Sequence, residues 1–67
     1  MVLQLMSKDK FMKAYANIIE DERNEIVVII EEKPYTWNRA FDEIKNDTEL
    51  GRKILEKLVE IGIISGD

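Results

Sequence analysis

The sequence predicts one small, mainly α-helical domain with about four helices and minimal strand. Three observations support this class: the chain has 67 residues, it contains one proline and three glycines, and its apolar residues recur three and four positions apart along much of its length. A chain this short has room for one domain with a thin core, so residues 1–67 are expected to form a single unit. We expect the four helices near residues 8–19, 22–32, 37–45 and 49–61.

The first expected helix, residues 8–19, has a cap, an acidic residue in its first turn and one apolar face. Ser7 is a good N-cap residue, and Asp9 suits the positive end of a helix. The apolar face consists of Phe11, Met12, Tyr15, Ile18 and Ile19. Residues 1–6 would then precede the helix as a mobile tail, with Met6 as an alternative initiator.

Residues 22–32 allow two structures. Ile26–Ile30 is an unbroken run of β-branched residues, which favours a strand, whereas the polar flanks suit a helix. An unbroken apolar run has no periodicity, so the pattern does not decide between them. The main prediction is a helix, which would point Ile26, Ile29 and Ile30 inward. The alternative is a β-hairpin over residues 26–37 that turns at residues 31–34.

The third helix, residues 37–45, follows a clear break in the chain. Pro34 lacks an amide donor and disfavours the helical conformation at Lys33, so it should end the preceding element. Thr36 is a suitable N-cap for the helix. Apolar residues then follow at positions i, i+3, i+4 and i+7, namely Trp37, Ala40, Phe41 and Ile44.

The fourth helix, residues 49–61, has Asp47 or Thr48 as its cap and carries apolar and charged residues on opposite sides. At about 100° per residue, the apolar side consists of Leu50, Ile54, Leu55, Leu58 and Ile61. Gly62 suits the left-handed position that ends a helix, with Ile63 packing back against it. Residues 63–65 can add a short strand. The last two helices should bury Trp37, Phe41, Ile54 and Leu58 together.

Composition excludes most enzyme chemistry. The chain has no Cys and no His, which removes the usual ligands of structural zinc, the commonest general base and the thiolate nucleophile. We therefore expect no catalytic activity, no metal site, no cofactor and no small-molecule ligand. No signal peptide fits the start, and no run approaches the roughly 18 apolar residues of a transmembrane helix. A cytoplasmic protein without a membrane partner is expected.

Acidic charge is concentrated in one segment of the chain. Ten basic and 14 acidic side chains give a net charge of -4, and residues 20–32 alone contribute -5. The protein also combines many Glu and Lys residues with a single Gln and no Cys, as hyperthermophile proteins tend to do.

The order of apolar and special residues over about residues 22–64 resembles that of the winged helix-turn-helix superfamily, in particular small archaeal and bacterial ArsR- or MarR-like regulators. The chain ends this stretch with the family's pattern of a leucine, three residues, a glycine and two apolar residues, beginning at Leu58. The other matching positions are Arg23, Ile26, Ile30, Pro34, Thr36, Trp37, Ala40, Phe41, Ile44, Ile54 and Leu55.

The resemblance implies a DNA-binding transcriptional regulator. Residues 37–45 would form the positioning helix and residues 49–61 the recognition helix, with Thr48, Arg52 and Lys53 nearest the major groove of double-stranded DNA. Arg39 and Lys57, together with Arg52 and Lys53, would form a sparse basic edge along these two helices.

A second hypothesis is a protein-interaction or dimerisation module that keeps this scaffold without binding DNA. The partner would then be a second copy of the chain or another protein. Three features favour it: the acidic balance, a recognition helix whose three basic and three acidic side chains cancel, and a truncated wing after Ser65. Gly51 also replaces an apolar side chain that the family usually buries.

Overall fold

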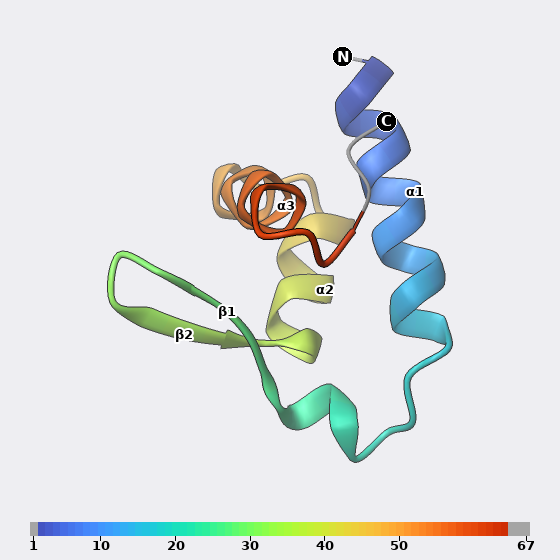
Figure 1. The fold of residues 1–67 in the computed structure, drawn as a ribbon, viewed down its shortest axis with the longest axis vertical. Coiled ribbons are helices and arrows are strands. Elements are labelled where there is room, and N and C mark those ends of the chain that lie inside the picture. The colour runs from blue at the N-terminus through green and yellow to red at the C-terminus, as the bar shows by residue number, and fades with distance from the viewer. Residues whose placement is uncertain (1, 65–67) are drawn as a thin grey trace.

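The computed structural model describes the backbone of residues 2–64 and the side chains of residues 7–64 (Figure 1). Three α-helices and a small antiparallel sheet make up this part of the chain. The elements, in order, are α1 (Val2–Ala16), the short 3-10 helix η1 (Glu22–Asn24), β1 (Ile26–Ile30), β2 (Lys33–Thr36), α2 (Trp37–Lys45) and α3 (Glu49–Glu60). In Figure 1, α1 lies on one side of α2 and α3, and the β1–β2 hairpin projects from the other side.

The expected helix over residues 22–32 is wrong, and the alternative hairpin is confirmed. Only Glu22–Asn24 is helical, as a single 3-10 turn, and Ile26–Ile30 pairs antiparallel with Lys33–Thr36. A strand suits the β-branched run because such side chains are restricted in a helix but pack well on a pleated surface. The pairing buries Val28, which is 5% exposed, against the helices.

The hairpin turns at Glu31 and Glu32, whose φ angles are 51° and 70°. Two central residues with positive φ are the requirement of a type I′ turn, which Asn and Gly usually satisfy. Pro34 does not end the preceding element but lies within β2, opposite Ile29. Proline is tolerated there because β2 is an edge strand of a two-stranded sheet.

Helix α1 begins and ends earlier than the sequence predicts. It starts at Val2, so residues 2–6 continue the helix rather than precede it, while Met1 lies outside the described residues. Ser7 is therefore not the N-cap but a buried residue inside the helix, 4% exposed. The helix ends at Ala16, and Arg23 donates hydrogen bonds from Nε and Nη2 to the Tyr15 carbonyl at 3.3 and 3.1 Å. The same carbonyl accepts a hydrogen bond of 3.2 Å from the Ile18 amide, so the guanidinium adds to the hydrogen bonds that close the end of the helix.

Helices α2 and α3 confirm the predicted caps. Thr36 Oγ1 accepts a hydrogen bond from the Arg39 amide at 3.1 Å, and Thr48 Oγ1 accepts one from the Gly51 amide at 2.9 Å. Gly62, with φ of 85°, ends α3 in the left-handed conformation.

The chain after α3 departs from the prediction in one respect. The amides of Gly62 and Ile63 bond back to the carbonyls of Val59 and Leu58 at 3.1 and 2.9 Å, which is the Schellman pattern. However, Ile63 remains 48% exposed, and Ile64, 7% exposed, is the residue that packs into the core. Neither is in a strand; the rest of the expected strand and the truncated wing fall on residues 65–67, outside the described residues.

The core draws on all three α-helices, on β1 and on Ile64 after α3. Its buried members are Phe11, Val28, Ala40, Ile44, Ile54, Leu55, Leu58 and Ile64. Trp37 and Phe41 were expected to be buried with Ile54 and Leu58 but are only partly buried. Trp37 stacks on Phe11 and Phe41 stacks on Tyr15, with ring centroids 5.6 and 4.1 Å apart.

Candidate functional site

The helix pair α2–α3 is joined by a connection that several side chains fix. Asp47 has a positive φ of 56°, and its carboxylate accepts a bond of 2.8 Å from Lys8 Nζ of α1. Thr48 Oγ1 caps α3 and donates to Glu43 Oε1 at 2.5 Å. Arg39 Nε donates to the other oxygen of Glu43 at 3.1 Å. The connection is therefore a network of hydrogen bonds rather than a loose loop.

Glu43 is the centre of this network. The hydrogen bond from Thr48 and then the neighbouring Arg39 hold the pKa of the Glu43 carboxyl below its ordinary value, although partial burial acts in the opposite direction. Its side chain is 17% exposed. The charged form of Glu43 thus links α2 to the cap of α3.

Gly51 lets α3 approach α2 closely. A Cβ atom at this position would clash with the carbonyl oxygen of Glu43 and lie 2.7 Å from the carbonyl carbon of Glu43 and 2.9 Å from the nitrogen of Ile44. All three are backbone atoms of α2. Glycine replaces the apolar side chain expected here because there is no space for one.

Three of the predicted DNA contacts lie at or near the α2–α3 connection, and each has a partner within the chain. Arg39 is paired with Glu43. Thr48 is used as the cap described above. Arg52 has an exposed side chain on α3, and its Nη1 donates a hydrogen bond of 3.5 Å to the Asp47 carbonyl. Any phosphate contact from Arg39 would compete with an existing ion pair.

The other two predicted contacts lie on the side of α3 that faces the hairpin. Lys53 Nζ is 3.9 Å from Glu31 Oε2 at the hairpin turn, and Lys57 Nζ is 2.9 Å from Glu60 Oε1. Both pairs are exposed, so each contributes about 0 to 1 kcal/mol. The structure therefore places Lys53 and Lys57 beside acidic groups, as it does Arg39.

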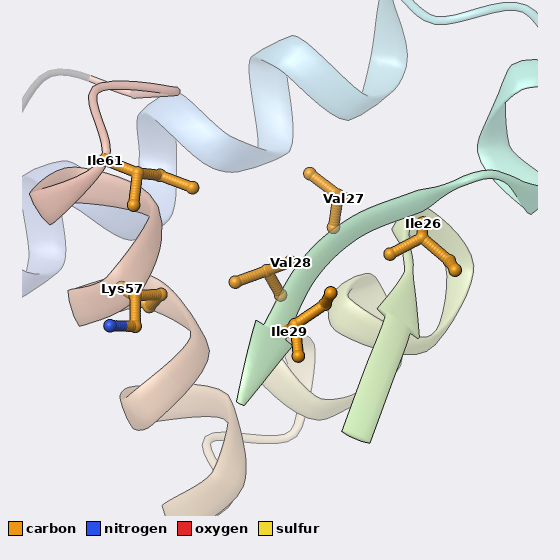
Figure 2. Close-up of a pocket in the computed structure, with 6 residues that line it drawn as sticks. All are labelled: Ile26, Val27, Val28, Ile29, Lys57 and Ile61. Atoms are coloured by element: carbon orange, nitrogen blue, oxygen red, sulfur yellow. The ribbon is translucent and has the colours of Figure 1, made fainter. Parts of the chain in front are cut away.

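A groove lies between β1 and the C-terminal end of α3 (Figure 2). We call it the β1–α3 groove; its volume is about 370 Å³ and its lining residues are Ile26, Val27, Val28, Ile29, Lys57 and Ile61. Figure 2 shows Val28 pointing from β1 toward α3 and Ile61 pointing back from the end of α3. The side chains of Ile26, Ile29 and Ile61 are 58%, 60% and 51% exposed, which is high for isoleucine.

A second hollow extends this groove along α3. It has a volume of about 250 Å³, shares Lys57 with the first, and is otherwise lined by Ile30, Lys53, Glu56 and Glu60. An apolar section beside Ile26–Ile29 thus leads into a section with mixed charge toward the hairpin turn.

One edge of β1 remains available for hydrogen bonding. In a hairpin with a two-residue turn, the pair beside the turn exchanges hydrogen bonds, and this pair is Ile30 and Lys33. The next pair, Ile29 and Pro34, does not, so the N–H and C=O of Ile29 point away from β2. Among residues 2–64, no other element forms a backbone hydrogen bond with Ile29.

Sequence reasoning missed the β1–α3 groove. A helix over residues 22–32 would point Ile26 and Ile29 inward, and the angular positions of residues around α3 put Ile61 on its buried side. In the structure these three are among the most exposed apolar side chains of the described chain. A signal was present in the run Ile26–Ile30 itself. If the run is a strand of a sheet that is covered on one face only, alternate residues must face solvent, which accounts for Ile29 beside the buried Val28. The exposure of Ile26 does not follow from alternation, because the strand register shifts between Ile26 and Val28.

The remaining surface gives little support to other classes of site. Within residues 7–64, no group of three or more acidic side chains is placed to hold a metal ion. No helix in the described part of the chain is long and apolar enough to cross a bilayer. Comparison with known proteins gives no match to a family model, to a curated protein or to a solved structure.

Proposed function

We propose that the chain is a protein-interaction module, built on a helix-turn-helix scaffold, that binds its partner in the β1–α3 groove. The observation that carries the proposal is the cluster of three isoleucines, each more than half exposed, around a groove beside an unpaired strand edge. Contiguous exposed apolar surface with a polar rim is typical of protein-binding sites in small soluble domains.

Electrostatics also favours a protein partner over DNA. Affinity for a duplex comes largely from neutralising phosphates, and the chain has a net charge of -4. The two lysines of α3 that face the hairpin have carboxylates beside them, Glu31 near Lys53 and Glu60 near Lys57, and Glu32 adjoins Glu31 at the hairpin turn. A duplex that approached Lys53 would meet these carboxylates.

The proposal is tested by selecting peptides from a displayed random library on the immobilised chain and titrating the selected peptides by NMR. We expect methyl shifts at Ile26, Ile29 and Ile61 and a dissociation constant in the micromolar range or below. Ile29→Lys should weaken binding at least about tenfold, a change of about 1.4 kcal/mol. The matched control is Ile19→Lys, since Ile19 is equally exposed, at 65%, but lies outside the groove. Selected peptides that bind the two variants equally would refute the proposal.

DNA binding through α3 is the second candidate. It is favoured by one specific observation: α2 and α3 are joined by only Asn46–Thr48, a connection of the length found in helix-turn-helix units. In this case Thr48, Arg52 and Lys53 would lie nearest the duplex. Titration with a labelled duplex at two salt concentrations tests it, because a true binder loses affinity with a log-log slope of about -0.9 per phosphate contacted. Lys53→Ala would then reduce the slope, whereas the interaction module shows no saturable binding at low salt.

A further inference from the structure

We infer that the β1–α3 groove takes an extended peptide segment of another protein, which adds to β1 as a third strand and carries Lys or Arg at both ends of an apolar centre. This inference rests on the proposed function and specifies the class of partner.

The free edge of β1 is suited to an added strand. The N–H and C=O of Ile29 point away from β2, and Ile29 is one of the residues that line the groove beside β1. Extended peptides are commonly bound by such edges, where main-chain hydrogen bonds supply affinity and alternate side chains enter neighbouring pockets. Here the alternate side chains would meet Val28 and Ile61 in the groove.

Charge at the two ends of β1 indicates what the segment carries. Glu25 immediately precedes the strand, and Glu31 and Glu32 immediately follow it; all three are exposed. Within the part of the chain whose side chains are described, the Glu31 carboxylate is paired only with Lys53, at 3.9 Å, and a partner can replace this exposed pair at small cost. In the middle of the groove, Lys57 is neutralised by Glu60. An apolar segment with basic ends therefore matches the groove at its centre and at both ends.

The same charges argue against a second copy of this chain as the occupant. Antiparallel pairing of two β1 strands would place Glu25 of one copy opposite Glu31 of the other at both ends of the pair. Parallel pairing would instead bring Glu25 beside Glu25. Like charges directly opposite each other destabilise strand pairs, and charged edges are a common protection against self-association.

The experiment uses the full chain and four synthetic peptides. The first has a centre of alternating valine and threonine with two lysines at each end, and the second has the same centre with glutamates at the ends. The third is the first peptide with N-methyl groups on the amides of one edge, which keeps its charge but removes the strand donors. The fourth is a basic amphipathic helix. Affinity is measured by fluorescence anisotropy and amide exchange of Ile29 by NMR.

We expect the lysine-flanked strand to bind at least about tenfold more tightly than the glutamate-flanked and N-methylated peptides, and to slow exchange of the Ile29 amide at least about tenfold. Glu25→Lys combined with Glu31→Lys should reverse the preference between the two charged strands. The matched control is Glu49→Lys, an exposed glutamate on α3 that does not line the groove, which should leave the preference unchanged.

Failure of this inference is distinguishable from failure of the proposed function. Binding of the helical peptide, or of any peptide that shifts Ile29 and Ile61 methyls without protecting the Ile29 amide, overturns strand addition while the interaction module stands. A dimer by sedimentation that protects the Ile29 amide in the absence of peptide also overturns it, because the edge would then be occupied by a second copy. Salt-dependent duplex binding with no peptide response in the groove overturns both.

Discussion

Replacing Gly51 with alanine tests how closely α3 approaches α2. The new Cβ would clash with the Glu43 carbonyl oxygen and lie 2.7 Å from the carbonyl carbon of that residue and 2.9 Å from the nitrogen of Ile44. These atoms belong to the backbone of α2 and cannot rotate away. The substitution can be accommodated only if α3 moves, and this movement would strain the hydrogen bond of 2.9 Å from the Gly51 amide to Thr48.

The magnitude follows from two opposing effects. Alanine in place of glycine in an unobstructed helix stabilises by about 0.5 to 1 kcal/mol. Forcing an extra carbon into packed surroundings costs about 1 to 3 kcal/mol, and contact with backbone atoms places Gly51 in the upper part of that range. The net loss should be about 1 to 2 kcal/mol. For a domain of this size, that corresponds to a fall in Tm of roughly 4 to 16 °C.

Thermal and urea unfolding followed by far-UV circular dichroism measures this loss. Gly62→Ala is the control, since a Cβ there meets nothing within 4 Å and the cost arises only from the φ of 85°. Gly51→Val should lower the free energy of unfolding more than Gly51→Ala does, because the clash grows with side-chain size. If Gly51→Ala melts at or above the wild-type temperature, the close approach of α2 and α3 is refuted.

Three further predictions concern the hairpin turn, Glu43 and the core. Glu31→Asn combined with Glu32→Gly should raise stability by about 1 to 2 kcal/mol, because Asn and Gly adopt positive φ at lower cost than Glu. Glu31→Gln, which removes only the charge, should change stability by less than about 0.5 kcal/mol, and equal melting temperatures for the two variants would contradict this. Because the pKa of Glu43 is lowered in the folded state, its charge stabilises the fold at neutral pH, and this contribution disappears as pH falls through the folded pKa. Glu43→Gln should therefore melt at a lower temperature than the wild type at neutral pH and at the same temperature in acid. A difference in melting temperature that is independent of pH would count against the network. Phe11→Ala should cost about 3 to 5 kcal/mol in urea unfolding, since Phe11 is fully buried, and a loss under about 1 kcal/mol would exclude the core described above.

Helices α2 and α3 were predictable because their boundaries depend on neighbouring residues. A threonine cap forms with an amide three positions later, as Thr36 and Thr48 do, and Gly62 ends α3 through bonds within the last turn. Apolar spacing along these helices then identifies Ile44, Ile54 and Leu58 as buried. Such information is local, so it can be read from a short window of sequence.

The hairpin and the end of α1 depend on residues that are distant in the sequence or lack the usual signal. A turn through Glu31 and Glu32 has none of the Asn-Gly or Asp-Gly signature of a type I′ turn. Helix α1 stops where Arg23 reaches its Tyr15 carbonyl, a contact between residues on two different elements. Apolar periodicity therefore predicts neither the hairpin turn nor the end of α1, and the unbroken apolar run of β1 shows no periodicity at all.

The candidate site was predictable in residue type but not in arrangement. Sequence identifies Arg39, Lys53 and Lys57 as exposed cations, and the structure agrees that none of them is buried. The pairing of Lys53 with Glu31, however, exists only because the hairpin lies beside α3. A helix over residues 22–32 would have given α3 different neighbours and a different charge environment.

The hairpin also explains why an apolar surface and acidic charge occur together. Burying Val28 under α3 makes the next residue, Ile29, face outward, and a sheet of two strands leaves one edge of β1 without a partner. An exposed apolar edge invites self-association, but Glu25 and Glu31 at its ends make pairing between copies unfavourable. In the proposed complex, the same carboxylates would attract a segment of opposite charge. The charge that weakens the case for DNA is therefore the charge that would keep this edge free for a basic, extended partner.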